Sequence, residues 1–435
     1  MTHLDLGKDV HAMPFREVRI QSMSAQQPQI LAIIGQGYVG LPLAMAAVDA
    51  GWSVIGVDNF EAKVAQINGG YSPVEDITDA QLQAAISKGA YKASTDYSLV
   101  AEASVITICV PTPLDEKREP DLALLRSAAT GIAPYVSNET LVVSESTSYP
   151  GTLRDIIIPI VNSLKPTESS KVYFASAPER VNPGDPVWNQ KNTPRLVGSI
   201  DEESQIRALA FYESICDAAV SVSTPEVAEA AKLLENTFRL VNIALINEFN
   251  QLCSASGINV HEVIDAASSK PYGYMPFRPG VGVGGHCIPV DPLYLTWWAR
   301  QNGSKAAFVE SADSINHEMP KYVAQRALNL VDSDIKNPKV LILGVAYKPG
   351  VGDVRETPVS ELRDHLKAQG ANVAWHDPLV PIWEGSNPVD LDWVCDVAIL
   401  ATKQPGMDLS QLIAKGVPIL DCTNSLSGQA GVTSL

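Results

Sequence analysis

The chain has 435 residues, of which 46% are hydrophobic, together with 30 prolines and 29 glycines. This composition excludes a disordered or fibrous protein and supplies enough apolar side chains for two or three hydrophobic cores. The formal net charge of −17 repels nucleic acid and anionic lipid, so we expect neither as a partner. The six cysteines form no CxxC pair and no Cys/His cluster. We therefore expect no metal site, no disulfide framework and a reducing, cytoplasmic compartment.

The first part of the chain raises the question of a signal or a membrane segment. Residues 1–28 contain charge, Gln and Ser without a continuous apolar run, which indicates a loose N-terminal extension rather than a secretory signal. The segment from Ile30 to Val48 is uncharged and about as long as a bilayer span. Gly35, Gly37 and Pro42 are among the residues that interrupt it. The pattern therefore predicts a strand, a tight turn and a helix, and no membrane partner.

From Ile30 onward, short apolar runs alternate with longer segments of helix-like spacing. Strands rich in Val and Ile are typical of a parallel sheet covered on both faces, because a parallel crossover needs a helix. The runs are ILAIIG, SVIGVD, SVITICV, TLVVSES, KVYFASA and RLVGSI. This alternation predicts a first α/β domain over residues 29–222.

A helical region is predicted for residues 223–334. From Thr224 to about Ser256 the chain has no internal helix breaker, opens with a Thr-Pro pair as cap and first-turn proline, and stops before Gly257. This predicts one long helix, followed by further helices that the glycine-rich stretch 280–285 interrupts.

The α/β alternation restarts at Pro338. The runs KVLILG, NVAWHD, DVAILA and PILDC predict a second, smaller α/β domain over residues 335–435. The predicted fold class is therefore α/β, with two parallel sheets joined by a long central helix.

A dinucleotide fingerprint follows the first predicted strand and opens a helix, which is the context that this motif requires. Its residues are Gly35, Gln36, Gly37, Tyr38, Val39 and Gly40. Gly35 permits the tight turn, Gly37 lets the backbone approach a pyrophosphate at the helix N-terminus, and Gly40 lets helix and strand pack closely. Asp58 ends the second predicted strand, 18 residues after Gly40, and no arginine follows nearby. A carboxylate there accepts hydrogen bonds from a ribose and repels a 2′-phosphate, which favours NAD over NADP.

The glycine-rich stretch leads directly into a cysteine, Cys287. Glycines leave backbone N–H groups accessible to a phosphate or a sugar oxygen. Pro289 suits the first turn of a helix, so we expect Cys287 near a helix N-terminus that stabilises a thiolate, with Asp291 on the same face. Most cysteines are simply small buried hydrophobes, and four others are expected to be so: Cys109, Cys253, Cys395 and Cys422. Cys287 differs, because the glycines before it provide no side chains to pack in a hydrophobic core, whereas their exposed backbone can contact a ligand.

Seven motifs in order carry a resemblance to a known family. They are GQGYVGLPLA, CVPTPLDEKREPD, ESTSYPGT, APERVNPG, Lys232-x-x-x-Asn236, GVGGHCIPVDP, and Tyr347-Lys348 through Asp353-x-Arg355-Glu356. Over residues 29–425 the chain resembles the nucleotide-diphosphate-sugar 6-dehydrogenases, which include UDP-glucose and UDP-N-acetylhexosamine dehydrogenases. The resemblance implies two Rossmann-type domains joined by a long helix that forms a dimer or a higher homo-oligomer. It also implies that NAD binds the first domain and that the UDP-sugar lies between the domains.

The implied reaction converts a CH2OH group to a carboxylate, which removes four electrons and needs two NAD molecules in succession. Cys287 would capture the intermediate aldehyde as a thiohemiacetal and then become a thioester. The resemblance implies that Lys232 and Asn236 stabilise oxyanions, and their i, i+4 spacing places both on one face of the long helix. A solvated helix face is the alternative for these two residues.

Further site residues follow from the resemblance. Asp291 matches a carboxylate that orients water, and Thr147 and Glu179 match residues that assist thioester hydrolysis, although Glu179 alone could be an ordinary loop carboxylate. Lys348 and Arg355 match residues that reach the ligand phosphates, although either could be a surface ion pair. The implied cofactor site also includes Lys63, Pro111, Thr112, Thr147 and Arg355. The implied substrate site comprises Glu179, Arg180, Lys232, Asn236, Phe277, Gly282, Gly284, Gly285 and Lys348.

The sequence departs from the UDP-glucose branch at His286, Val290 and Pro183, where that branch carries Ser or Tyr, Lys, and a further Glu. The GHCIPVDP segment instead resembles enzymes acting on UDP-N-acetylhexosamines. The run PLYLTWWAR favours UDP-N-acetylglucosamine over UDP-N-acetylmannosamine. The uronic acid would feed a surface polysaccharide or a glycosylated product. UDP-glucose as substrate, a two-electron hydroxyacid-type dehydrogenase that needs no thiol, and a non-catalytic nucleotide-sugar sensor remain open alternatives.

Overall fold

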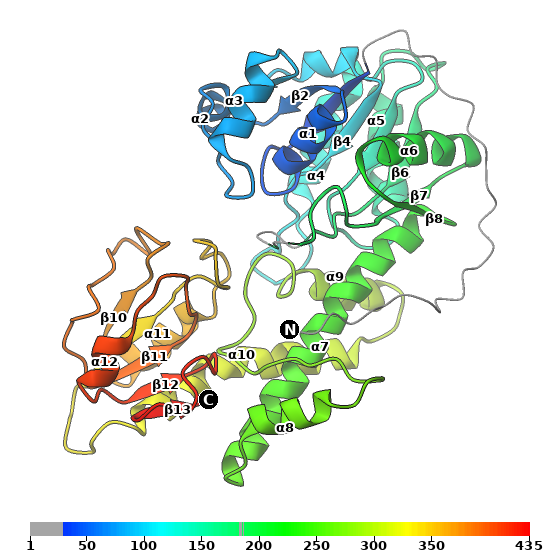
Figure 1. The fold of residues 1–435 in the computed structure, drawn as a ribbon. Helices are drawn as coiled ribbons and strands as arrows, with labels where there is room; N and C mark the ends of the chain where they lie inside the picture. Colours follow the sequence, from blue (N-terminus) through cyan, green and yellow to red (C-terminus); the bar gives the residue numbers. More distant parts are fainter. Residues whose placement is uncertain (1–28, 182–184, 186) are drawn as a thin grey trace.

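A computed structural model describes residues 29–181, 185 and 187–435 of the chain. Two sheets organise it, one in a large N-terminal lobe and one in a smaller C-terminal lobe, with long helices between them (Figure 1). The first sheet has the strand order β3 (Tyr91–Ser94), β2 (Ser53–Val57), β1 (Ile30–Ile34), β4 (Val105–Ile108), β5 (Leu141–Ser144), β6 (Tyr173–Ser176), β7 (Arg195–Ser199) and β8 (Ala219–Val222). The second has the order β10 (Asn372–His376), β9 (Lys339–Leu343), β11 (Val397–Leu400), β12 (Ile419–Asp421) and β13 (Val432–Ser434).

All ten apolar runs that predicted strands do form strands. The predicted parallel pairing is wrong at one place, because β6 and β7 run antiparallel. The described part of residues 177–194 contains no helix, so the chain lacks the crossover element that a parallel return would need. The sequence reading also missed β3, β8 and β13. The first two are short strands at the sheet edges and carry only partial apolar patterning, since β8 has no buried residue and β3 alternates buried with exposed.

Each face of the first sheet has its own core. Alternate residues of β1 point to opposite faces, so that Leu31 and Ile33 join one cluster and Ala32 and Ile34 the other. The first cluster packs under α1 (Gly40–Asp49), α2 (Glu61–Asn68), α3 (Asp79–Ser87) and α6 (Glu202–Ile215). The second packs under α4 (Ala123–Ile132) and α5 (Ile158–Leu164), with the short helical segments η1 (Tyr97–Glu102), η2 (Ala133–Tyr135) and η3 (Leu153–Ile157). Helices thus cover both faces, as predicted.

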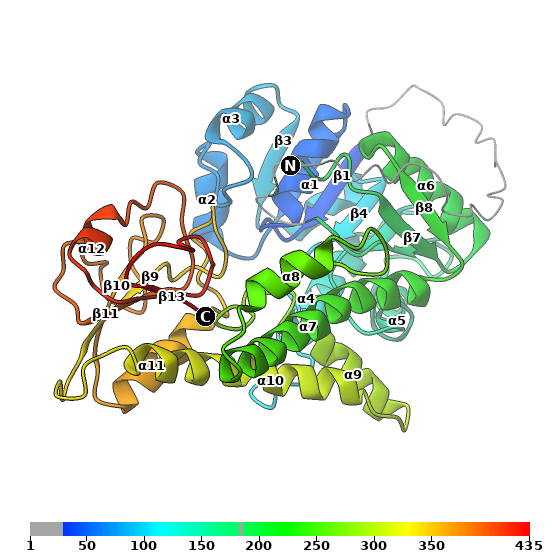
Figure 2. The ribbon, with the colours of Figure 1, turned by 60° about the horizontal axis from the view of Figure 1, so that its bottom comes forward.

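The predicted long helix is α7 (Pro225–Ala255). The Thr224 hydroxyl caps it by accepting from the Val227 N–H, and the chain leaves the helix at Gly257, whose φ of +69° suits glycine. Its 31 residues span about 46 Å. Figures 1 and 2 show α7 running from the first lobe past α8 (Val260–Ser268) and α9 (Asp291–Gln301), with α10 (Ala307–Leu328) lying against it.

The C-terminal lobe follows α10 directly. Its sheet is parallel throughout, and α11 (Val359–Ala368) and α12 (Ser410–Ala414) complete the lobe. None of the helices in the described residues is long and apolar enough to cross a membrane. The uncharged segment that begins at Ile30 is β1, a turn and α1, as predicted.

Candidate active site

The glycine fingerprint forms a tight turn between β1 and α1. Gly35 has φ +95°, and a Cβ there would lie 2.5 Å from the Cys109 carbonyl oxygen. A Cβ at Gly40 would lie 1.9 Å from the Gly35 carbonyl oxygen, whereas one at Gly37 would meet nothing within 4 Å. No side chain caps the N-terminus of α1. The turn therefore leaves open space and free N–H groups where a pyrophosphate binds in this motif.

Asp58 lies beside this turn at the carboxyl end of β2. Its carboxylate accepts from the Gln36 N–H at 2.9 Å and from the Phe60 N–H at 3.0 Å, and it pairs with Lys63 at 2.8 Å. Lys63, predicted in the cofactor site, thus holds the carboxylate that is expected to bind the ribose. The Asp58 carboxylate fits NAD better than NADP, because it can accept hydrogen bonds from a ribose and would repel a 2′-phosphate.

The ends of β4 and β5 complete this edge of the sheet. Parallel strands end at the same edge, which is where ligands bind in such sheets. Pro111 is exposed after β4, and the backbone oxygen of Thr112 accepts from the Tyr294 hydroxyl of α9 at 3.1 Å. Thr147 is half-buried just after β5, and the neighbouring Ser146 hydroxyl donates to the Val110 carbonyl at 2.8 Å. The first lobe and the central helices are therefore in direct contact at the predicted cofactor site.

Lys232 and Asn236 lie on the buried face of α7. They are 7% and 5% exposed, so a solvated helix face is excluded. The Asn236 amide donates to the Asp291 carboxylate at 2.5 Å. Burial raises the pKa of Asp291 to about 6, although the Lys232 charge and the Asn236 hydrogen bond both act to lower it. The Lys232 charge acts on both the Asp291 and the Glu179 carboxyl and lowers the pKa of each.

Cys287 lies in the turn immediately before α9. Cys287 thus lies near a helix N-terminus, as predicted, but α9 begins at Asp291, so that Pro292 rather than Pro289 stands in its first turn. The Cys287 carbonyl instead accepts from the Asp291 N–H at 2.8 Å, closing one turn ahead of the helix. Cys287 is exposed, in contrast to the buried Cys109, Cys253 and Cys422 and the half-buried Cys395.

The electrostatic setting of Cys287 favours the thiol over the thiolate in the ligand-free protein. Although Cys287 is exposed as a residue, neighbouring protein atoms desolvate its sulfur and raise the pKa of Cys287, and Asp291 raises it further. The charges of Lys232 and Arg239 act in the opposite direction. The sequence reading expected a thiolate stabilised by a helix dipole. The groups that lower this pKa are instead two cations of α7.

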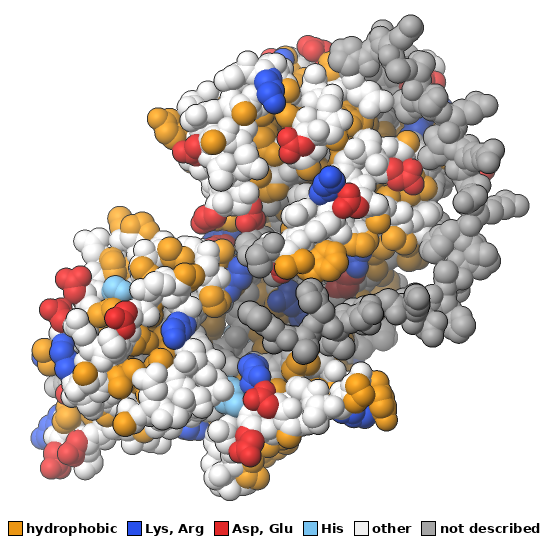
Figure 3. Space-filling view, in the orientation of Figure 1, with side chains coloured by type: hydrophobic (Ala, Val, Ile, Leu, Met, Phe, Trp, Pro, Cys, Tyr) orange, Lys and Arg blue, Asp and Glu red, His pale blue; other side chains and the backbone are white. Residues whose placement is uncertain are grey.

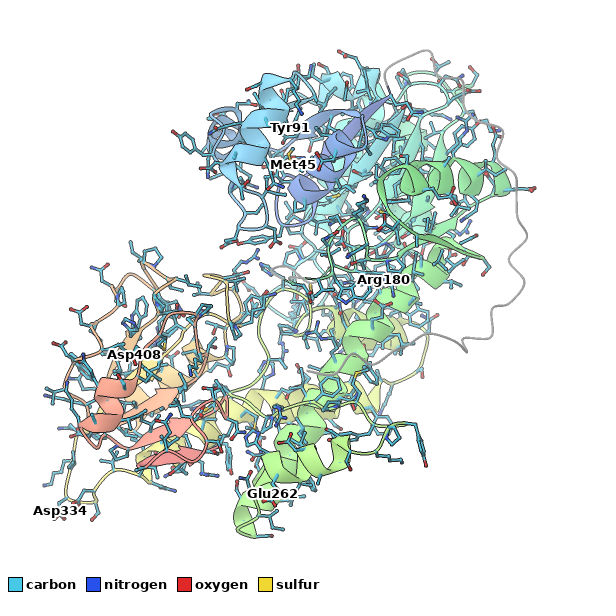
Figure 4. The ribbon with its side chains drawn as sticks, viewed as in Figure 1. Met45, Tyr91, Arg180, Glu262, Asp334 and Asp408 are labelled. Atoms are coloured by element: carbon cyan, nitrogen blue, oxygen red, sulfur yellow. The ribbon has the colours of Figure 1, made fainter. Side chains whose placement is uncertain are left out.

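Glu179 is not a free base. Its carboxylate accepts from Gln190 at 2.7 Å and from Arg195 at 2.9 Å, and it also accepts from two N–H groups of the chain that follows it. Burial opposes ionisation, but Arg195 and these hydrogen bonds keep the pKa of Glu179 below its ordinary value. The next residue, Arg180, pairs with Glu235 of α7 at 2.7 Å and lies where the first lobe meets α7 (Figure 4).

The glycine-rich loop packs against the C-terminal lobe. A Cβ on Gly284 would lie 2.8 Å from the Glu356 carbonyl oxygen, and a Cβ on Gly285 would lie 2.9 Å from the Tyr347 ring. A Cβ on Gly282 (φ +145°) would lie 3.1 Å from Pro358. These glycines therefore permit close contact between the lobes. The sequence analysis predicted only that their backbone contacts a ligand.

The two lobes also meet through Arg355. Its guanidinium forms a bidentate pair with Asp353 and lies 4.5 Å from the centroid of the Tyr38 ring in the fingerprint turn. Lys348 is half-buried, and burial is the main cause of its lowered pKa. Lys and Arg side chains gather at the hollow between the lobes in Figure 3.

Two residues of the site were placed differently or missed. Phe277 packs edge-on against Phe238 of α7, at 5.9 Å between centroids, and its predicted place in the substrate site stays a prediction. Arg239 was missed; it is exposed one turn beyond Asn236, and its charge acts on Cys287 and Lys348. Arg239 follows Asn236 by three residues and Lys232 by seven, so helical spacing alone could have placed it on the same face of α7. Pro183 lies outside the described residues.

Models of one family match three successive parts of the chain. The NAD-binding domain of the UDP-glucose/GDP-mannose dehydrogenase family matches residues 29–216, the central domain residues 226–318 and the UDP-binding domain residues 341–426.

The chain belongs to this dehydrogenase family. The dehydrogenase is an NAD-dependent oxidoreductase that acts on UDP-sugars, which confirms the predicted family, cofactor and enzyme class. Among its described residues, no group of three or more His, Cys, Asp or Glu side chains is placed to hold a metal ion.

Relatives of the dehydrogenase match over most of their length. It is 36% identical over 351 residues to a UDP-N-acetyl-D-mannosamine dehydrogenase of Methanocaldococcus jannaschii, covering 80% of this chain and 78% of the relative. It is 33% identical over 359 residues to a UDP-N-acetyl-D-glucosamine 6-dehydrogenase of Pseudomonas aeruginosa, covering 80% and 83%. The structure of a UDP-D-ManNAc dehydrogenase from Pyrococcus horikoshii is similar with a TM-score of 0.84 and 30% identity, over 93% of this chain and 99% of that one.

Substitution of Gly284 tests whether contact between the lobes matters for activity. Gly284→Ala places a Cβ against backbone and the Tyr347 side chain of the other lobe, so we expect NAD reduction with a UDP-sugar to fall about tenfold or more, because small displacements of a site are costly. Gly280→Ala is the matched control, since its Cβ would meet nothing within 4 Å. Initial rates on both variants, with circular dichroism to verify folding, provide the measurement. Equal rates for the two would contradict this role of the loop.

Proposed function

We propose that the protein oxidises the C6 hydroxymethyl group of a UDP-N-acetylhexosamine, the N-acetylglucosamine or N-acetylmannosamine epimer, to a carboxylate through a thioester on Cys287. The observation that supports this best is the group formed by Cys287, Asp291, Asn236 and Lys232. It joins an exposed cysteine, a buried carboxylate and a buried ammonium at the meeting of α7 and α9. Relatives named for both hexosamine epimers share the fold and the order of domains.

The residues present fit NAD at the fingerprint turn, where Gly37 leaves space and Asp58 provides a ribose partner. When bound, NAD supplies the hydride acceptor for each of the two oxidations. The site residues must then manage protons, oxyanions and the tethered intermediate. Lys232 is the cation that would stabilise a developing alkoxide, and its buried position strengthens that interaction.

Asp291 is the proton acceptor in this proposal. Its pKa of about 6 leaves it ionised at neutral pH, and the Asn236 amide fixes its orientation. The alcohol loses its hydroxyl proton and a hydride to give the aldehyde. The Cys287 sulfur adds to that aldehyde and the thiol proton passes to the aldehyde oxygen, giving a thiohemiacetal. Loss of a second hydride and the hydroxyl proton gives the thioester, and water then releases the carboxylate and restores the thiol.

The count of NADH formed per sugar consumed tests this function. With a panel of UDP-sugars, we expect two NADH per UDP-N-acetylhexosamine from the wild-type protein. Cys287→Ser should lose steady acid formation while its first oxidation can still be seen in a single turnover. Cys395→Ser is the control, because Cys395 is half-buried in the C-terminal lobe. One NADH per sugar would instead indicate a two-electron dehydrogenase, and none with any UDP-sugar would indicate a sensor.

We also propose that the protein forms a homodimer through the outer face of α7. Six large apolar side chains, 38% to 65% exposed, follow one face of this helix. They are Val227, Leu234, Phe238, Leu245, Phe249 and Leu252. An apolar stripe along a helix of this length is typical of an interface, and a second copy offers the same stripe in a self-complementary arrangement.

A charge in this stripe should separate the dimer. Leu245→Asp places a carboxylate at the middle of the proposed interface, so we expect the protein to elute as a monomer in size-exclusion chromatography with light scattering. Val394→Asp is the matched control, since it introduces the same charge at an apolar residue exposed elsewhere in the C-terminal lobe. An unchanged mass for Leu245→Asp would exclude this face as the interface.

A further inference from the structure

A buried ion-pair network lies beneath Glu179, outside the residues assigned so far to the chemistry. The guanidinium of Arg195, the first residue of β7, is 2% exposed. One of its terminal nitrogens donates to Glu179 at 2.9 Å and to Gln190 at 2.6 Å, while the other donates to Glu145 at 3.3 Å. The Tyr212 hydroxyl of α6 donates to the second oxygen of Glu145 at 2.6 Å.

This network spans the strands that end at the site. Glu145 directly follows β5, two residues before Thr147, and its backbone oxygen accepts from the Glu179 N–H at 3.2 Å. Glu179 follows β6, and Arg195 returns on the antiparallel β7. Because β7 is antiparallel to β6, its first residue, Arg195, lies at the same edge of the sheet as the carboxyl ends of β5 and β6, next to Glu179.

The charges in the network do not balance when both carboxylates are ionised. One guanidinium then faces two carboxylates in a region without solvent, and a net buried charge is costly. Burial accordingly raises the pKa of Glu145 to about 7; Arg195 and the Tyr212 hydrogen bond oppose the rise, and Glu179 adds to it. Other titratable groups of the described residues that act on the network or feel its charges are Cys109 after β4, Cys216 after α6, Lys232 of α7 and Cys287 before α9.

We propose that Arg195 and Glu145 are positioning residues for the reaction: Arg195, shared between Glu145 and Glu179, fixes the Glu179 carboxylate beneath the Cys287 site, and the charge on Glu145 sets how tightly Glu179 holds a proton. This inference rests on the proposed function, in which Glu179 assists thioester hydrolysis. The charge of Glu179 acts on the Cys287 thiol and that of Lys232 acts on Glu179, so these groups lie close enough to interact.

The sign of the effect follows from the charges. Below pH 7, Glu145 is protonated, so Glu179 is the ionised carboxylate that pairs with Arg195. Its pKa then stays low, and it is a weak base. Above pH 7, Glu145 ionises, draws on Arg195 and repels the Glu179 carboxylate. Glu179 then binds protons more readily, which favours activation of the hydrolytic water. Hydrolysis of the thioester should therefore accelerate through pH 7, separately from the ionisation of Asp291 near pH 6.

The test is the pH profile of steady-state turnover between pH 5.5 and 9, with the first NADH followed separately by stopped flow. Glu145→Gln retains an acceptor for Arg195 but cannot ionise. We expect it to lose the inflection near pH 7 and to keep the one near pH 6. A profile identical to that of the wild-type protein would overturn the proposal.

Arg195→Lys provides a second readout. It retains the positive charge but loses the fork that joins two carboxylates. We expect kcat to fall about tenfold to a hundredfold, with KM for the UDP-sugar within about twofold and the first hydride transfer unaffected. Arg207→Lys is the matched control, since Arg207 pairs with Glu139 and Glu203 in the same lobe.

A purely structural role would give a different pattern. Arg195→Lys would then lower the melting temperature, raise KM and slow both oxidations together, which would contradict the proposal. Should that variant not fold, the profile of Glu145→Gln decides alone. Failure of the proposed function is distinguishable, because the wild-type protein would then yield fewer than two NADH per sugar, whatever the variants do.

Discussion

The hydrogen bond from the Asn236 amide to the Asp291 carboxylate is the interaction on which the site depends. It joins α7, which carries Lys232, to the first residue of α9, and the Asp291 N–H in turn fixes the Cys287 carbonyl. An accessible thiol, a buried carboxylate and a cation are thereby brought to one place by two short contacts. A buried carboxylate without such partners would be costly, so the contacts that stabilise the packing of α9 on α7 also fix the orientation of the Asp291 carboxylate.

The two lobes are in close contact around this centre. The glycine loop before Cys287 accommodates Tyr347 only because Gly284 and Gly285 have no Cβ, and Arg355 of the C-terminal lobe lies over Tyr38 of the fingerprint turn. The C-terminal lobe therefore contacts both the loop that presents the thiol and the turn expected to hold NAD.

The parts of the fold that could be predicted from the sequence are those that depend on neighbouring residues in the chain. Apolar runs defined β1 and β9, Thr224 and Gly257 delimited α7, and the fingerprint glycines required their own turn. What escaped prediction depends on partners distant along the chain. The antiparallel β7 follows from the missing crossover helix, and the saturation of Glu179 follows from Arg195, 16 residues later. An arginine at the head of an apolar strand was the only hint of that buried network, and pattern alone could not name its two carboxylates.

The most direct test of the central claim is the pKa of the Cys287 thiol, measured as the pH dependence of alkylation by iodoacetamide with mass spectrometry of the peptide that contains Cys287. If Asp291 and Lys232 flank the sulfur as described, Asp291→Asn removes a negative charge and lowers that pKa, whereas Lys232→Met removes a positive charge and raises it. Shifts of opposite sign in the two variants are the predicted result. Unchanged values in both, or a shift in the reverse direction, would contradict the placement of Cys287 at the centre of the site.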